Sequence, residues 1–149
     1  MRILAVLSTI LLACAASSLT ASAAEEPKTD DSAGTEGKTV TTKSGLQITE
    51  LRPGDGVHPT RQSVVEVHYH GTFEDGKVFD SSVERGKPAT FPLNRVIACW
   101  TEGVALMSVG GKSRLVCPPK IAYGVRGAPP TIPPNSTLVF EVELLRIVK

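Results

Sequence analysis

Apolar and polar residues alternate along two long stretches of the chain, and this period of two is typical of β-strands with one buried face. In the first stretch one face carries Val65, Val67 and Tyr69, and the opposite face carries Glu66, His68 and His70. In the second stretch, Thr137–Ile147, the apolar face consists of Leu138, Phe140, Val142 and Leu144. Between them, Asp75-Gly76 predicts a tight hairpin turn after which Val78 and Phe79 return as a partner strand.

One segment has the helical period instead. Trp100, Val104 and Met107 fall on one stripe, which predicts a helix over about Trp100–Val109 that ends at Gly110-Gly111. So short a helix depends on packing against a sheet for its stability. Further strands are predicted at Leu46–Leu51 and Ser113–Cys117. Antiparallel strands with one amphipathic helix predict an α+β fold.

The N-terminal residues 1–23 are predicted to be a signal peptide. Arg2 supplies a positive end, Ile3–Ala13 is an apolar run, and Ala21-Ser22-Ala23 matches an A-x-A cleavage pattern. Cys14 leaves an alternative open, because Leu11-Leu12-Ala13-Cys14 resembles a bacterial lipobox, in which the cysteine becomes the lipidated first residue. We therefore expect an exported, periplasmic protein, either soluble or anchored as a lipoprotein through Cys14.

Residues 24–44 are predicted to form a disordered polar linker. Ala24–Lys43 contains one large aliphatic residue, Val40, and cannot bury enough apolar surface to offset its ordering entropy. Residues 45–149 are predicted to form a single domain. We expect a monomer, because no long helical segment that could mediate dimerisation precedes the domain. The 16 basic and 15 acidic residues nearly cancel, which argues against nucleic acid as a partner.

The alternating strands carry Tyr69 and Phe140 into one interior, and Asp80 follows Phe79 directly. No serine, cysteine or histidine in these segments is set up as a nucleophile. An aromatic site with one carboxylate and no nucleophile suits a reaction that breaks no covalent bond. Each residue also has a purely structural interpretation: the aromatic residues could be ordinary core, and Asp80 could cap the turn at Ser81-Ser82.

Taken together, the motifs resemble the FKBP-type peptidyl-prolyl cis-trans isomerases. They are VHYHGTFEDGKVFD at Val67–Asp80, V-I-x-x-W-T-E-G at Val96–Gly103, A-Y-G at Ala122–Gly124 and IPPNSTLVFEVELL at Ile132–Leu145. They recur in order with compatible spacing over residues 45–149. The resemblance implies a bent antiparallel sheet, a half-barrel, wrapped around one short helix. It also implies an enzyme that accelerates rotation about X–Pro bonds in folding proteins.

The resemblance implies the pocket residues as well, with Trp100 as the floor. The implied lining is Tyr69, Phe79, Val96, Ile97, Trp100, Tyr123 and Phe140. The backbone N–H of Ile97 would hold one substrate carbonyl and the Tyr123 hydroxyl another. Ile132 would contact the residue before the proline.

Asp80 would hydrogen-bond Tyr69 and Arg85 and place a negative charge near the twisting carbonyl. The bond rotation needs no proton transfer, metal or cofactor, so none is expected. The implied partners are unfolded or partly folded proteins that contain X–Pro bonds, and macrolides of the FK506 or rapamycin type are candidate ligands. The chain departs from the family pattern at Ala89, Cys99 and Ala128–Thr131, and these departures concern substrate preference and inhibitor affinity, not the reaction class.

Cys99 and Cys117 would be the only two cysteines after cleavage at Ala23. In an oxidising compartment such a pair is interpreted first as a disulfide. The alternative is two buried thiols that act as small apolar side chains. Glu66, His68 and His70 share one strand face, but a structural metal site usually needs four ligands, so we interpret that face as solvated.

Two other functions remain open. The same groove could hold apolar segments as a chaperone or binding module with little turnover, and an isomerisation assay separates this function from catalysis. A thiol oxidoreductase is the third hypothesis, although the chain contains no C-x-x-C motif.

Overall fold

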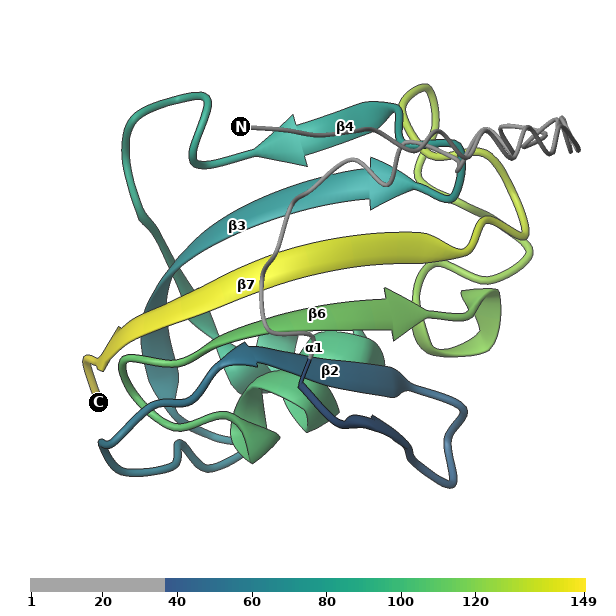
Figure 1. The fold of residues 1–149 in the computed structure, drawn as a ribbon. Coiled ribbons are helices and arrows are strands. Elements are labelled where there is room, and N and C mark those ends of the chain that lie inside the picture. The colour runs from purple at the N-terminus through teal and green to yellow at the C-terminus, as the bar shows by residue number, and fades with distance from the viewer. Residues whose placement is uncertain (1–36) are drawn as a thin grey trace, which may run out of the picture. The chain divides into compact units, whose positions relative to one another are not determined.

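A computed structural model of the chain describes residues 37–149, in which a curved antiparallel sheet of seven strands packs against one short helix (Figure 1). The predicted signal peptide, Cys14 and most of the predicted linker lie outside the described residues. The strands are β1 (Thr39–Thr41), β2 (Gln47–Arg52), β3 (Val64–Phe73), β4 (Val78–Ser81), β5 (Ala89–Pro92), β6 (Lys112–Cys117) and β7 (Leu138–Ile147). No helix in this part of the chain is long and apolar enough to cross a membrane.

The strand order is β1-β2-β6-β7-β3-β4, and β5 also pairs with β3. Strands β4 and β5 therefore share one edge of β3: β5 pairs with Val64–Val67 and β4 with His70–Thr72. The chain between them, Ser82–Pro88, leaves the sheet at this edge. The arrangement brings Asp80 and Phe91 to the same side of β3 as Tyr69.

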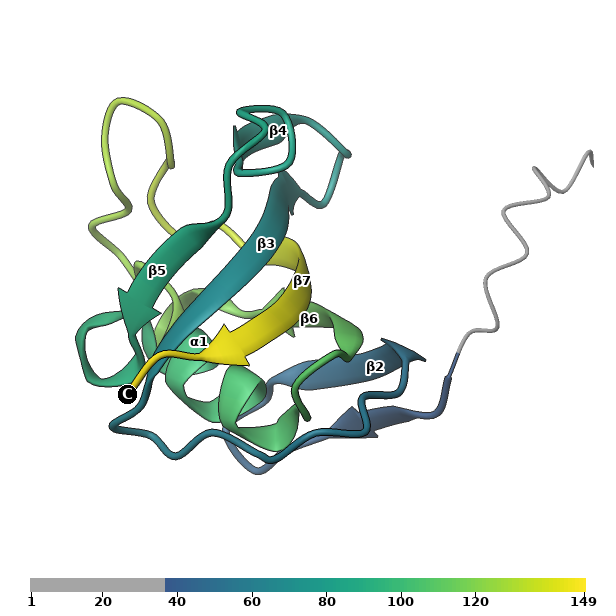
Figure 2. The same ribbon diagram turned by 90° about the vertical axis from the view of Figure 1, so that its left-hand side faces the viewer.

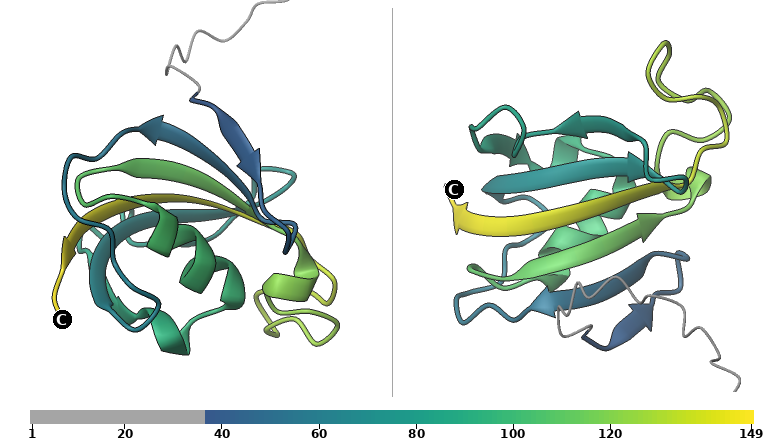
Figure 3. Two further views of the ribbon diagram at one scale, coloured as in Figure 1. Left: turned by 90° about the horizontal axis from the view of Figure 1, so that it is seen from below. Right: turned by 45° about the horizontal axis from the view of Figure 1, so that its top comes forward.

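The sheet bends over helix α1 (Ala98–Gly103), which lies on its concave side (Figures 2 and 3). The inward-facing residues of β3 and β7 form the core, and all are at most 5% exposed: Val65, Val67, Tyr69, Leu138, Phe140, Val142 and Leu144. The predicted alternation of both strands is thus confirmed. The α+β half-barrel predicted from the resemblance is confirmed as well.

The helix is shorter than the sequence predicts. α1 ends at Gly103 and continues only as a 3₁₀ turn, η2 (Val104–Leu106), so the prediction of a helix to Val109 is wrong at its C-terminal end. Met107 leaves the turn with an extended backbone, and its side chain is 3% exposed in the core. The helical backbone therefore ends before Gly110-Gly111 is reached.

The predicted linker also needs correction at its C-terminal end. Thr39–Thr41 pairs with β2 in register Thr39 to Thr49 and Thr41 to Gln47, so ordered structure begins before residue 45. These residues are exposed, and backbone pairing to an edge strand holds them in place. Composition could not reveal this strand, because its stability does not come from burying its own side chains.

A disulfide joins Cys99 in α1 to Cys117 at the end of β6, with a Cα–Cα separation of 5.8 Å. Both cysteines are fully buried. The bond links the helix directly to the sheet that it packs on. It lies next to Trp100, so it also anchors the residue that carries the largest side chain of the helix.

Candidate active site

A pocket of about 500 Å³ opens between β3, β4, β5, the start of α1 and the loop after β6. Its lining is largely aromatic and aliphatic: Tyr69, Phe79, Asp80, Phe91, Arg95, Val96, Ile97, Trp100, Tyr123 and Phe140. Such a site, apolar with a few polar groups, is typical of small-ligand pockets.

Trp100 forms the aromatic base of this pocket and is 4% exposed. The rings of Tyr69, Phe91 and Phe140 each meet it in an edge-to-face geometry, with centroid distances of 5.3 to 5.4 Å. Edge-to-face contacts of this kind favour a fixed mutual orientation. The pocket base is therefore preorganised rather than collapsed around a flexible side chain.

Gly71 in β3 makes room for the rings above it. A Cβ atom at this position would lie 2.7 Å from Cζ of Phe79 and 3.1 Å from Cε1 of Phe140. Phe79 and Phe140 themselves meet edge to face at 5.4 Å. Glycine at this position thus allows two pocket walls to pack across the strand.

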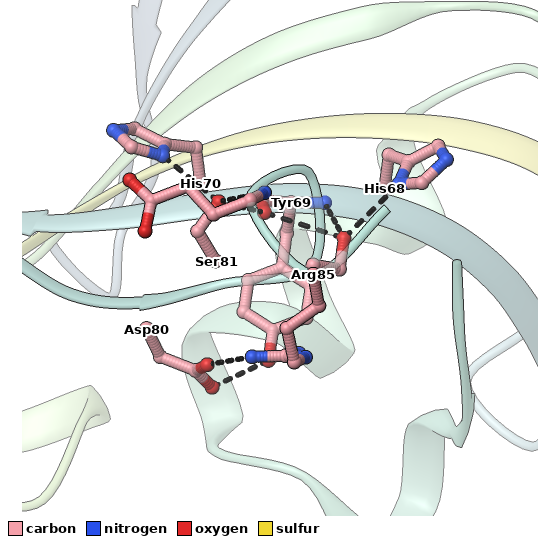
Figure 4. Close-up of polar contacts among 8 residues, drawn as sticks. His68, Tyr69, His70, Asp80, Ser81 and Arg85 are labelled. Atoms are coloured by element: carbon pink, nitrogen blue, oxygen red, sulfur yellow. Dashed lines mark hydrogen bonds and ion pairs between the residues drawn. The ribbon is translucent and has the colours of Figure 1, made fainter. Parts of the chain in front are cut away.

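Asp80, Tyr69 and Arg85 form a polar triangle at the rim (Figure 4). The Tyr69 hydroxyl donates to one carboxylate oxygen of Asp80, and the Arg85 guanidinium donates to the other. The same guanidinium donates to the Tyr69 hydroxyl oxygen at 2.9 Å. These contacts are the ones that the resemblance implied for Asp80.

The triangle sets the protonation of its members. Burial raises the pKa of Tyr69, and the hydrogen bond to Asp80 raises it further, so the hydroxyl remains a donor. Burial alone would raise the pKa of Asp80, but the hydrogen bonds from Tyr69 and Arg85 and the arginine's charge outweigh it. The pKa of Asp80 therefore lies below its ordinary value, and the group is an anion at neutral pH.

The segment that carries Asp80 is held to the outer edge of β3 by two serines. Ser82 Oγ accepts a hydrogen bond of 2.8 Å from the Tyr69 backbone N–H and lies 3.1 Å from Nδ1 of His68. Ser81 Oγ lies 3.0 Å from Nδ1 of His70 (Figure 4). The side chains of His68 and His70 therefore contact these two serines, and neither histidine lines the pocket.

Two polar groups in the pocket lining have no partner within residues 37–149. The Ile97 N–H precedes the first turn of α1 and donates no hydrogen bond to this part of the chain. The Tyr123 hydroxyl likewise makes no hydrogen bond there, and Tyr123 is 41% exposed. Both groups are available to a ligand in the pocket.

The indole N–H of Trp100 is buried and also has no hydrogen-bond partner in the described part of the chain. A buried donor without a partner carries a desolvation cost. In this pocket, three edge-to-face ring contacts occupy the space around the indole in place of polar neighbours.

The pocket brings together eight of the sequence-predicted site residues: Tyr69, Phe79, Asp80, Val96, Ile97, Trp100, Tyr123 and Phe140. Arg85 is not among the lining residues, and its guanidinium contacts Asp80 and Tyr69. Ile132 does not line it either: it is 5% exposed in the core and its backbone bridges to Ala128.

Two lining residues, Phe91 and Arg95, were missed by the sequence analysis. The strand that carries Phe91 is four residues long and ends at Pro92, too short for periodicity to reveal it. Arg95 closes the 3₁₀ turn η1 (Leu93–Arg95), directly before Val96. The only sequence signal for Arg95 was its position directly before Val96, a predicted site residue.

A half-barrel sheet over a short helix, with a preorganised aromatic pocket, defines a class of small α+β domains. Residues 56–145 match the family model of the FKBP-type peptidyl-prolyl cis-trans isomerases. The chain therefore belongs to the FKBP-type peptidyl-prolyl cis-trans isomerase family.

Individual proteins that the chain resembles carry the same family name. The chain is 56% identical over 108 residues to the FKBP-type peptidyl-prolyl cis-trans isomerase FkpA of Aeromonas hydrophila, covering 72% of this chain and 40% of the relative. It is 51% identical over 106 residues to peptidyl-prolyl cis-trans isomerase Fkbp12 of Drosophila melanogaster, covering 69% and 98%. The crystal structure of FkpA from Escherichia coli aligns with a TM-score of 0.72 at 47% identity, covering 76% and 53%.

The chain thus spans less than half of its Aeromonas relative and nearly all of the Drosophila relative. The match covers the domain that contains the pocket.

Proposed function

We propose that this protein is a peptidyl-prolyl cis-trans isomerase that accelerates X–Pro rotation in folding proteins. The observation that carries the proposal is the aromatic pocket itself, built on Trp100 and rimmed by the free Ile97 N–H, the Tyr123 hydroxyl and the Asp80 carboxylate. Family membership supports the same activity.

The chemistry requires stabilisation of a twisted amide and no bond cleavage. Rotation about the peptide bond has a barrier of about 18–20 kcal/mol because amide resonance must be lost. Each ~1.4 kcal/mol by which the pocket favours the twisted over the planar amide accelerates rotation about tenfold. An apolar environment does this, since the planar amide is the more dipolar of the two.

In this mechanism the proline ring lies on the Trp100 indole, between the side walls of the pocket. The Ile97 N–H and the Tyr123 hydroxyl donate to the carbonyls on either side of the proline. The Asp80 anion lies near the carbonyl that rotates, with Arg85 and Tyr69 holding its orientation. Ile132, in the loop over the pocket, contacts the residue before the proline.

The remaining parts of the proposal concern the protein's setting. The N-terminal sequence pattern supports export and a periplasmic location, soluble or lipid-anchored through Cys14. A monomer, and binding of macrolides of the FK506 or rapamycin type, belong to the same proposal. N-terminal sequencing of the protein recovered from cell envelopes separates cleavage after Ala23 from lipidation at Cys14.

An X–Pro isomerisation assay, with and without such a macrolide, tests the central proposal. We expect saturable catalysis that the macrolide inhibits. A protein that binds X–Pro peptides without accelerating their isomerisation would instead be a binding module or chaperone.

A further inference from the structure

A second hollow of about 300 Å³ lies beside the aromatic pocket and shares a wall with it. Its lining is Arg61, Val96, Ala98, Thr101 and Glu102, and Val96 also lines the aromatic pocket. The half-buried Val96 thus borders both hollows. A peptide bound in the first hollow and extended past Val96 would reach the second.

The charged groups along this path are two arginines and one glutamate. Arg95 lies in the aromatic pocket and Arg61 in the second hollow. Both are exposed, and neither forms an ion pair within residues 37–149. Glu102 is half-buried, and its carboxylate accepts a hydrogen bond of 2.6 Å from Ser44 Oγ.

The other charges at the aromatic pocket are already compensated. Asp80 is paired with Arg85, so this pair adds no net charge to the path. With two free arginines against one glutamate that already accepts a hydrogen bond, the path has a net positive charge. An acidic side chain is the complement that this path would bind.

We propose that the second hollow is an extended substrate subsite, in which Arg61 and Arg95 select acidic residues that flank the proline on one side. The inference rests on the proposed isomerase function and names its substrate class. Only one flank of a bound peptide can cross Val96, because the wall lies on one side of the pocket. The preference for acid must therefore be one-sided.

The test compares isomerisation of X–Pro peptides that carry Asp, Asn or Lys at flanking positions, before the proline in one set and after it in another. We expect kcat/KM for the Asp peptide to exceed that for the Asn peptide about two- to five-fold on one flank at low ionic strength, the range of an exposed ion pair. Added salt should reduce the preference.

Variants assign the effect to residues. Arg61→Gln and Arg95→Gln should each weaken the preference and together abolish it, whereas Glu102→Gln should strengthen it. Arg114→Gln is the matched control, since Arg114 is an exposed cation on β6 that lines neither hollow. Arg114→Gln should leave activity on the Asn peptide and the preference for Asp unchanged, and far-UV circular dichroism of the Arg61 and Arg95 variants checks that their fold is intact.

Two results overturn the inference. The first is a preference for Asp over Asn that is equal on both flanks or absent. The second is a loss of that preference in Arg114→Gln as large as in Arg61→Gln, which would mean that the net charge of the protein, rather than the subsite, causes it. If no peptide is turned over, the proposed function fails instead. In that case NMR titration of the Asp and Asn peptides still decides the subsite, through the shifts of the Val96 and Thr101 amides.

Discussion

Among the residues that line the pocket, Asp80 carries the negative charge, and its surroundings define its role. The side chains of Asp80 and Arg85 are 45% and 51% exposed. Exposed ion pairs contribute only roughly 0.2–1 kcal/mol to the free energy of unfolding. The pair therefore does little for stability, and its geometry matters because it fixes the position of the Asp80 carboxylate in the pocket lining.

Replacing this carboxylate should separate activity from stability. We expect Asp80→Ala and Asp80→Asn to lower kcat/KM, about tenfold for each ~1.4 kcal/mol of lost transition-state stabilisation. The free energy of unfolding should fall by no more than about 1 kcal/mol. Glu84→Gln is the control, an exposed acid nearby that does not line the pocket. Unchanged turnover in both Asp80 variants would refute the role assigned to the carboxylate.

The pH profile follows from the same triangle. Because the pKa of Asp80 is lowered, its stabilising contribution is complete above its ordinary value and is lost only as the pH falls through the native pKa, in the acid range. The pKa of Tyr69 is raised, so its hydroxyl does not ionise near neutrality. We expect kcat/KM to be nearly flat from about pH 6 to 8. A bell-shaped profile centred there would exclude the non-covalent mechanism.

At the scale of elements, helix α1 and strand β7 present the pocket base together. α1 has six residues, too few to be stable alone, so packing against the sheet holds it. Trp100 from the helix and Phe140 from the strand meet edge to face at 5.4 Å. Loss of either ring disturbs the interface between helix and sheet and the pocket base at once.

Truncation of these two rings should therefore affect both properties. Trp100→Ala and Phe140→Ala should each lower the free energy of unfolding by about 3–5 kcal/mol and reduce activity. Trp100→Phe is the informative companion: it removes an N–H that has no partner in the described residues, so its cost should be well below that of alanine. Denaturant unfolding measures the free energy of unfolding, and isomerisation assays with X–Pro peptides measure the activity. A Trp100→Ala protein of parental stability would contradict this account.

Across the whole molecule, the disulfide between Cys99 and Cys117 connects the helix that carries the pocket floor to the central part of the sheet. Its sequence separation of 18 residues closes a loop worth about 3 kcal/mol in the chain-entropy account. Both cysteines are buried. Because Cys99 directly precedes Trp100, the bond also restrains the backbone next to the pocket floor.

Reduction of this bond should lower the melting temperature and, by loosening Trp100, reduce activity modestly. The stability loss should not exceed about 3 kcal/mol. Thermal unfolding with and without reductant measures the change in melting temperature. Thiol titration of the unfolded, non-reduced protein without Cys14 measures directly whether Cys99 and Cys117 are bonded. Two free thiols would eliminate the bridge and leave the pair as ordinary core residues.

Features that depend on short-range pattern were predictable from the order of residues alone. The alternation around Val67 and Val142 places their neighbours on a buried or an exposed face, because a strand has a fixed period of two. The Asp75-Gly76 turn follows from the backbone freedom of glycine, and Gly76 indeed has a φ of 83°. The family motifs then gave eight of the pocket residues.

Features that depend on packing between distant segments emerged from the three-dimensional arrangement. Phe91 enters the pocket because β5 pairs with β3, a contact that four residues cannot encode locally. The helix ends before Met107, whose side chain is buried in the core although its backbone is extended. Val96 borders two hollows that residues far apart in the sequence line together. Local patterns fix which way side chains point along an element, whereas non-local packing fixes which side chains meet.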